Sequence, residues 1–223
     1  MNIITGSAGG LGKHVYEHFK ENNHQVLGLD VTDSSSTDLV TNLSNKDEIK
    51  NFINKVDTKI ESITFSHAIG NSKKNIDEFS EDYYRFLNAE SNFYIIDRLK
   101  EQFNNEASVL FISSVHSQLT NKESSNYALS KLYLEALYRR FCLDDNPNNI
   151  RKSLIRLGAM DTAMLRDNVG SLEKLKSALP STSIIDPKTI ADFIYNFHTK
   201  YKTDFDCSVL QLDNGVGYQL STD

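Results

Sequence analysis

The sequence predicts an α/β fold in which a doubly wound parallel sheet carries helices on both faces. Its 223 residues suit one domain, and no Pro/Gly/Ser-rich linker divides them. Short apolar runs alternate with longer segments of helical periodicity, which is typical of a parallel sheet with crossover helices. A glycine-rich turn joins the first apolar run to the first periodic segment. We therefore assign residues 1–223 to a single domain.

The apolar runs predict six strands. Each run is short and rich in Val, Ile, Leu or Phe, as expected of strands that are buried on both faces of a parallel sheet. They are expected at residues 2–5, 25–29, 62–65, 108–112, 152–157 and 208–212.

The periodic segments predict five helices that are long enough to cross from one parallel strand to the next. Asp186-Pro187 indicates a helix start with proline in the first turn. Ser44, with Asp47 three residues later, predicts a capped start for the second helix. The helices are expected at residues 10–21, 46–56, 81–102, 124–143 and 187–200.

Composition excludes several classes of partner. Lys and Arg total 24 against 30 Asp and Glu, and this net charge of −6 disfavours nucleic acid and anionic lipid. Two cysteines, Cys142 and Cys207, make neither a disulfide framework nor a CxxC zinc pair, which favours a reducing cytoplasm. No apolar run approaches the ~18 residues of a membrane span, and residues 1–5 lack a signal-peptide pattern. We expect a cytoplasmic protein that contacts no membrane.

The turn at residues 5–12, Thr-Gly-Ser-Ala-Gly-Gly-Leu-Gly, follows the first strand and opens the first helix. Glycine permits positive φ and lets a pyrophosphate approach the backbone, while the helix N-terminus offers free N–H groups and partial positive charge. A Walker P-loop is excluded because His14 follows Gly12-Lys13 and Ser7 stands where that motif begins with glycine. The turn predicts a Rossmann-type dinucleotide site.

Asp30 ends the second predicted strand, eighteen residues after Gly12. An acid about 20 residues beyond the glycine turn hydrogen-bonds the adenosine ribose in such folds, and a carboxylate there repels a 2′-phosphate. Lys13 is the only nearby base. The cofactor is therefore predicted to be NAD, with NADP disfavoured.

Tyr127 and Lys131 lie four residues apart on a predicted helix and so share one face. A phenol with a pKa near 10 is a poor acid or base at neutral pH, and an adjacent ammonium lowers that pKa. The same helix is apolar on two sides, with Leu129, Leu132 and Ala136 opposite the Tyr/Lys face. We expect it to pack between the sheet and a second subunit.

The order and spacing of these motifs resemble the short-chain dehydrogenase/reductase family over nearly the whole chain. The resemblance is carried by the turn at residues 5–12, Asp30, Asn88, Ile112-Ser113-Ser114, Tyr-Ala-Leu-Ser-Lys at residues 127–131, and Leu157-Gly158 followed by Thr162. The chain departs from the family pattern at Ser66-His67-Ala68-Ile69, where Asn-Asn-Ala-Gly is frequent, and at Leu157, where proline is common.

This resemblance implies a catalytic tetrad. Tyr127 would be the general acid/base, and Lys131 would lower its pKa and hold the nicotinamide ribose. Ser114 would hydrogen-bond the substrate oxygen, and Asn88 would hold the water that links Lys131 to solvent. The cofactor itself would carry the hydride.

The resemblance also implies the cofactor contacts. Thr162 would touch the nicotinamide carboxamide, and Asn42 and Leu43 would flank the adenine. The full predicted set is Gly6, Ser7, Gly10, Leu11, Gly12, Asp30, Asn42, Leu43, Ala68, Tyr127, Lys131 and Thr162. His67 and His116, near this site, are interpreted as hydrogen-bonded loop residues, and no histidine has partners at metal-ligand spacing, so no metal is expected.

The predicted function is an NAD-dependent oxidoreductase that interconverts a secondary alcohol and a ketone, with a small-molecule substrate. The resemblance, together with the two-sided helix, implies a homodimer or homotetramer. Two alternatives remain open at this point: a sugar epimerase or dehydratase of the same fold that uses bound NAD, and a non-catalytic protein that senses the dinucleotide. Residues at about 163–186 are the one stretch left to cover the substrate, and we interpret them as a lid. The sequence does not select among alcohols and ketones.

Overall fold

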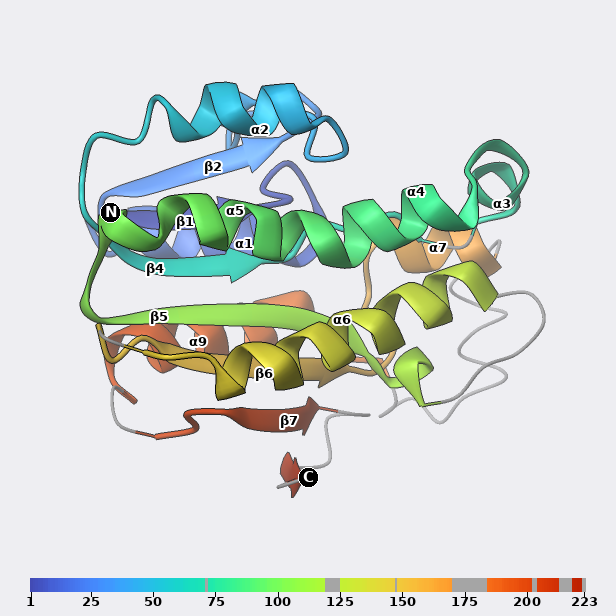
Figure 1. The fold of residues 1–223 in the computed structure, drawn as a ribbon. Coiled ribbons are helices and arrows are strands. Elements are labelled where there is room, and N and C mark those ends of the chain that lie inside the picture. The colour runs from blue at the N-terminus through green and yellow to red at the C-terminus, as the bar shows by residue number, and fades with distance from the viewer. Residues whose placement is uncertain are drawn as a thin grey trace.

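An eight-stranded sheet runs through the centre of the part of the chain that the structure describes (Figure 1). The structure is a computed structural model, and it describes residues 1–70, 72–118, 125–146, 148–169, 184–201, 204–212 and 218–221. The strand order is β3-β2-β1-β4-β5-β6-β7-β8, and only β8 runs antiparallel to its neighbour. The strands are β1 (Asn2–Thr5), β2 (Val26–Asp30), β3 (Leu39–Val40), β4 (Ile60–Phe65), β5 (Phe103–Ser114), β6 (Arg151–Leu157), β7 (Ser208–Leu212) and β8 (Tyr218–Ser221).

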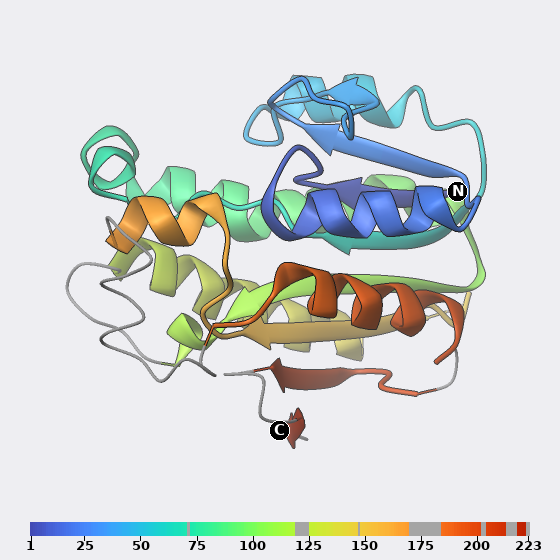
Figure 2. The ribbon, with the colours of Figure 1, turned by 180° about the vertical axis from the view of Figure 1, so that it is seen from behind.

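Helices cover both faces of the sheet, which confirms the predicted fold class. Figure 1 shows α2, α4, α5 and α6 on the near face, and Figure 2 shows α1 and α9 on the opposite face. Two separate apolar clusters fill the two interfaces, one beneath α2, α5 and α6 and one beneath α1 and α9. The helices are α1 (Gly10–Glu21), α2 (Lys46–Ile53), α3 (Lys73–Glu78), α4 (Glu81–Arg85), α5 (Ser91–Leu99), α6 (Ser125–Leu143), α7 (Ala163–Val169) and α9 (Pro187–Thr199).

The strand order reverses between β1 and β4. From β1 the chain moves outward to β2 and β3, then returns to place β4 on the other side of β1. Loops that leave the carboxyl ends of such neighbouring strands diverge, and the crevice between them is where ligands bind in open α/β sheets. The fold therefore positions a binding site at the ends of β1 and β4.

Two strands, β3 and β8, were not predicted from the sequence, and the cap of α2 was assigned to the wrong residue. β3 has only two residues, and the sequence of β8, Tyr-Gln-Leu-Ser, contains no run of apolar residues, so neither gives the signal that identifies a strand. Helix α2 is capped by Asn45, whose side chain accepts from the amides of Asp47 and Glu48, whereas the Ser44 hydroxyl bonds the Asn42 side chain. The predicted helix start at Asp186-Pro187 is confirmed, and Asp186 caps α9 by accepting a hydrogen bond from the Lys188 amide.

The segment predicted as one helix at residues 81–102 contains a π-helical turn at Phe86–Glu90 between α4 and α5. A π turn widens the helix locally, and such turns are frequent at functional sites. Asn88 lies inside it and is fully buried. The irregularity thus falls at a residue that the family resemblance places in the site.

Candidate active site

A cavity of about 710 Å³ opens at the carboxyl end of the sheet. Its walls come from the glycine turn after β1, the ends of β2, β4, β5 and β6, the first turns of α6, and α7. It brings together most of the predicted site residues: Gly6, Gly10, Leu11, Asp30, Ala68, Ser114, Tyr127, Lys131 and Thr162 all line it.

The glycine turn has the shape of a phosphate cradle. Gly6 and Gly10 have φ of +72° and +51°, in the left-handed region that favours glycine. Gly9 is the N-cap of α1 and has no side chain to cap the helix, so the N–H groups of the first turn remain available to a ligand. A Cβ on Gly12 would stand 2.1 Å from the Gly6 carbonyl oxygen, so this glycine lets α1 approach the turn. These features fit a dinucleotide pyrophosphate.

Asp30 joins the end of β2 to the glycine turn. Its carboxylate accepts one hydrogen bond from the Ala8 amide at 3.0 Å and another from the Thr32 amide at 2.9 Å. All three residues line the cavity. A carboxylate oxygen has two lone pairs, so each can accept a further bond from a hydroxyl.

Ser114, Tyr127 and Lys131 meet where β5 faces α6. The Tyr127 hydroxyl is hydrogen-bonded to the Ser114 side chain. Lys131 Nζ lies 5.8 Å from the centroid of the Tyr127 ring and donates to the Ile112 carbonyl oxygen at 2.8 Å. Because Ile112 and Ser114 belong to the same strand, the last residues of β5 hold both ends of the Tyr/Lys pair.

Burial governs the titration of this pair. It raises the pKa of Tyr127 above its ordinary value of 10.0, and the hydrogen bond with Ser114 opposes this only in part. Burial also lowers the pKa of Lys131 from 10.5 to about 8, against the attraction of the Glu135 carboxylate, which raises it. Both shifts favour the uncharged forms, as expected for ionisable groups removed from water.

Asn88 lies behind the cavity wall. Its Oδ1 accepts from the Ile69 amide at 2.8 Å, and its Nδ2 donates to the Ile69 carbonyl oxygen and to Ser130 Oγ, at 3.1 and 2.9 Å. Ser130 precedes Lys131 on α6. Asn88 therefore ties the loop after β4 to the helix that carries Tyr127 and Lys131.

Four of the predicted cofactor residues are not among those that line the cavity: Ser7, Gly12, Asn42 and Leu43. Ser7 is fully buried, and its carbonyl oxygen accepts from Ser36 Oγ at 2.6 Å. Leu43 belongs to the apolar cluster under α2 and α5. The structure uses Ser7, Gly12 and Leu43 to build the turn and the core.

His67 lines the cavity as a hydrogen-bonded loop residue. Its Nε2 lies 3.0 Å from the Leu87 carbonyl oxygen and its Nδ1 lies 2.7 Å from Thr5 Oγ1. A carbonyl oxygen only accepts, so Nε2 carries the proton and Nδ1 accepts from the threonine. Burial, with the nearby charge of Lys131, lowers the pKa of His67 to about 3, and the imidazole is neutral near pH 7.

Sequence reasoning missed a buried ion pair between Glu135 of α6 and Arg156 of β6, with Arg156 Nη2 2.7 Å from Glu135 Oε2. A signal existed, because Glu135 follows Lys131 by four residues and hence shares its face of the helix. The partner could not be found this way, since nothing in the sequence places β6 opposite that turn of α6.

The start of the predicted lid lies at the cavity mouth. Ala163, Met164 and Leu165 of α7 line the cavity, and Met160 forms an isolated bridge with Ile185. Residues 170–183 of the predicted lid lie outside the described residues. In the ranges that the structure describes, no group of three or more His, Cys, Asp or Glu could hold a metal, and no helix is long and apolar enough to cross a membrane.

Known proteins resemble this chain along almost its whole length. A family model described as enoyl-(acyl carrier protein) reductase matches residues 6–216. An uncharacterized short-chain type dehydrogenase/reductase of Sinorhizobium fredii, y4vI, is 24% identical over 237 residues, which cover 96% of this chain and 43% of that protein. The chain thus spans less than half the length of this curated relative.

Solved structures share the fold. A short chain dehydrogenase family protein from Francisella tularensis has a TM-score of 0.84 at 22% identity, over 96% of this chain and 97% of its own. A Burkholderia cenocepacia short chain dehydrogenase solved with NADP reaches 0.82 at 13% identity, over 96% of both chains. The 3-alpha-hydroxysteroid dehydrogenase of a Pseudomonas species, solved with NADH, reaches 0.79 at 17% identity, over 96% and 95%. The family match, with this fold, shows that the chain belongs to the short-chain dehydrogenase/reductase family.

Proposed function

We propose that the protein is an NAD-dependent oxidoreductase that interconverts a secondary alcohol and a ketone by hydride transfer. The observation that carries this proposal is the convergence of Ser114, Tyr127 and Lys131 in one cavity with the glycine turn and Asp30. A phenol, a hydroxyl and an amine at one end of a dinucleotide cradle are the groups that a carbonyl reduction needs.

The residues present fit a dinucleotide. The uncapped start of α1 would hold the pyrophosphate, and Asp30 would accept from the hydroxyls of the adenosine ribose. Relatives solved with NADP and with NADH share the fold, so the fold does not choose between them. Our preference for NAD rests on the Asp30 carboxylate, which would repel a 2′-phosphate.

The bound nicotinamide would supply or accept the hydride. In the direction of reduction, the Tyr127 hydroxyl donates its proton to the substrate oxygen, and in the direction of oxidation the phenolate takes that proton back. Ser114 Oγ donates a hydrogen bond to the same oxygen and so stabilises the negative charge that develops there. The hydrogen bond between Tyr127 and Ser114 supports this part of the proposal, because two groups that bond each other can reach the same substrate oxygen atom.

Lys131 acts on the phenol. With a pKa of about 8 the amine is mostly protonated at pH 7, and its positive charge favours the phenolate that forms during reduction. Asn88 holds the loop after β4 against Ser130, the residue before Lys131. We assign Asn88 a positioning role toward Lys131 and, as the family resemblance implies, the water that would link Lys131 to solvent.

The experiment follows NADH absorbance with purified protein and a panel of secondary alcohols and ketones, with NADP(H) in parallel. The proposal predicts net NADH formation from an alcohol and net NADH loss with the matching ketone. Substrate conversion without net NADH change would identify an epimerase or dehydratase. Dinucleotide binding without turnover on any member of the panel would instead favour the sensor.

A further inference from the structure

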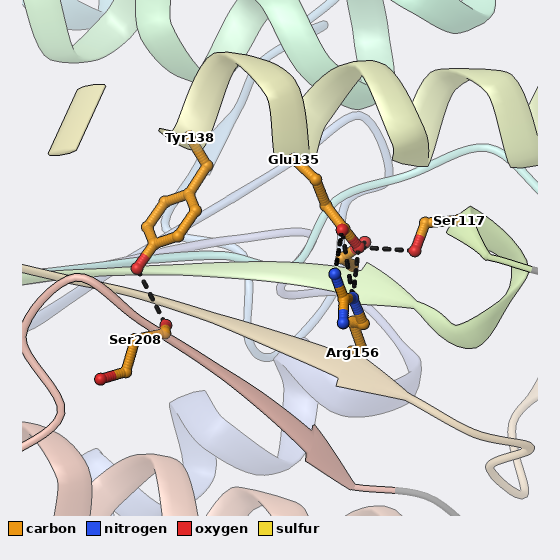
Figure 3. Close-up of polar contacts among 6 residues, drawn as sticks. Ser117, Glu135, Tyr138, Arg156 and Ser208 are labelled. Atoms are coloured by element: carbon orange, nitrogen blue, oxygen red, sulfur yellow. Dashed lines mark hydrogen bonds and ion pairs between the residues drawn. The ribbon is translucent and has the colours of Figure 1, made fainter. Parts of the chain in front are cut away.

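A buried ion pair joins Glu135 of α6 to Arg156 of β6 and has no part in the proposed chemistry (Figure 3). The side chains of Glu135 and Arg156 are each 4% exposed. Arg156 Nε contacts both carboxylate oxygens, at 3.0 and 3.1 Å, and Nη2 contacts Oε2 at 2.7 Å. Removing two charges from water is costly, and replacing a buried ion pair by apolar residues of similar volume often leaves a protein equally stable or more stable. The pair therefore calls for a role other than stability.

The Glu135 carboxylate holds the segment that carries Ser114 through two hydrogen bonds. Glu135 Oε1 accepts from Ser113 Oγ at 2.8 Å and from Ser117 Oγ at 2.6 Å. These two serines flank Ser114, Val115 and His116, all of which line the cavity. One carboxylate oxygen from α6 thus fixes both ends of residues 113–117, the serine segment, which presents Ser114 to Tyr127.

The ion pair is also connected to Tyr127 and Lys131, the other two groups of the proposed site, and to the end of β6. On α6, Glu135 follows Lys131 by four residues and Tyr127 by eight, so the three lie along one side of the helix. On β6, Arg156 precedes Leu157, which lines the cavity with Gly158. The ion pair therefore joins the Tyr/Lys helix, the serine segment and the end of β6.

Glu135 supplies the negative charge that acts on Lys131. Its carboxylate raises the pKa of Lys131, and burial opposes it. Tyr127 on α6, whose pKa is raised by burial, and His67 after β4, whose pKa is lowered by burial to about 3, are uncharged near pH 7. His116, whose ring centroid lies 6.0 Å from that of Tyr127, lines the same cavity. The guanidinium of Arg156 on β6 is paired with this carboxylate at 2.7 Å.

We propose that Glu135 and Arg156 form a positioning pair that holds Ser114 against Tyr127 and sets the electrostatic environment of Lys131. The inference rests on the proposed function, since it assigns no chemistry of its own. Neither residue lines the cavity, so both act through the groups that Glu135 contacts.

The test compares four variants with the wild type. Glu135→Gln removes the carboxylate charge and leaves Arg156 unpaired, whereas the double variant Glu135→Gln/Arg156→Gln removes both charges. Ser117→Ala removes one serine contact and no charge. Tyr138→Phe is the matched control because its hydroxyl, also buried on α6, donates to the Ser208 carbonyl oxygen (Figure 3) and not to the serine segment. The same hydroxyl lies 3.2 Å from the Lys152 carbonyl oxygen.

The readouts are kcat for ketone reduction and NADH affinity, each measured against pH, together with the melting temperature. Removing the Glu135 charge lowers the pKa of Lys131, so the alkaline limb of kcat should move to lower pH by about one unit. The shift should be larger in the single variant, where Arg156 stays charged. We expect kcat to fall at least tenfold in the double variant and several-fold in Ser117→Ala, with NADH affinity at pH 6 within threefold of the wild type.

Tyr138→Phe should lower the melting temperature and leave the pH profile unchanged. The positioning role would be overturned by two results together. In the Glu135 variants, kcat would fall at the same alkaline pH as in the wild type, and its value would match that of Tyr138→Phe. If the Glu135 variants do not fold, Ser117→Ala decides alone: a kcat no lower than that of Tyr138→Phe would overturn it.

The proposed function can fail separately. If the wild type binds NADH but turns over nothing, the pH dependence of NADH affinity replaces kcat, and an unshifted profile in the Glu135 variants overturns the positioning role. If the wild type binds no dinucleotide, both proposals fall together, because there is then no site for the pair to position.

Discussion

Tyr127 and Lys131 stand in an environment that disfavours charge on either. Burial raises the pKa of the phenol and lowers that of the amine to about 8. Hydrogen bonds to Ser114 and to the Ile112 carbonyl oxygen hold the two groups in place. The spacing of Tyr127 and Lys131 predicted their shared face, but not how far burial removes them from water, which depends on the side chains that other elements place around them.

At Asp30 we predict a preference for NAD(H) over NADP(H). The carboxylate faces the cavity from the end of β2 and would repel a 2′-phosphate. Replacing it in Asp30→Asn should strengthen NADP(H) binding by about tenfold, as expected when a like charge is removed from a phosphate. Isothermal calorimetry with both cofactors checks this.

The matched control for Asp30 is Asp47→Asn, which neutralises an exposed carboxylate on α2 and should change neither affinity. Tighter binding of NADP(H) than NAD(H) by the wild type would show that our interpretation of Asp30 is wrong.

At the scale of elements, the glycine turn depends on Gly12 more than on its neighbour Gly9. A Cβ on Gly12 would stand 2.1 Å from the Gly6 carbonyl oxygen, while a Cβ on Gly9 would meet nothing within 4 Å. Forced overpacking of this kind costs about 1–3 kcal/mol. We predict that Gly12→Ala lowers the free energy of unfolding by that amount, measured by urea denaturation, and that Gly9→Ala changes it little. Equal effects from the two variants would contradict the proposed packing of α1 on the turn.

The regular elements were predictable because their signals are local. Buried apolar runs identified β1, β4 and β7, and the proline after Asp186 identified the start of α9. The π turn that holds Asn88 was not predictable, since Phe86–Glu90 continues the helical pattern on both sides. Its register is set by contacts with Ile69 and Ser130, which come from other parts of the chain.

At the scale of the whole molecule, apolar side chains are exposed on the outer side of α6. Leu129 and Leu132 are 43% and 49% exposed, whereas Leu134 and Tyr138 on the sheet side are buried. This two-sided helix supports the expected homodimer or homotetramer. Light scattering should give a mass of two or four times 25.3 kDa, and Leu132→Glu should reduce it to that of the monomer.

Leu143→Glu is the control for that experiment, because Leu143 is an exposed leucine at the end of the same helix. A monomeric mass for the wild type would contradict the oligomer.

Most of the candidate site was predictable from the fold, because the carboxyl ends of parallel strands lie at the same edge of the sheet. Gly6, Asp30, Ala68 and Ser114 follow or end four different strands, and all line one cavity. The Glu135–Arg156 pair was not, since it depends on the side-chain facing of α6 and β6.

Turnover and cofactor binding by Tyr127→Phe test the central claim most directly. The substitution removes the hydroxyl that is bonded to Ser114 and keeps the ring. Loss of a general acid/base costs roughly 10²–10⁴ in rate. We predict that kcat falls by this factor while NADH titration gives a Kd within threefold of the wild type. A variant that keeps wild-type turnover with unchanged NADH affinity would contradict the assignment of Tyr127 as the proton donor.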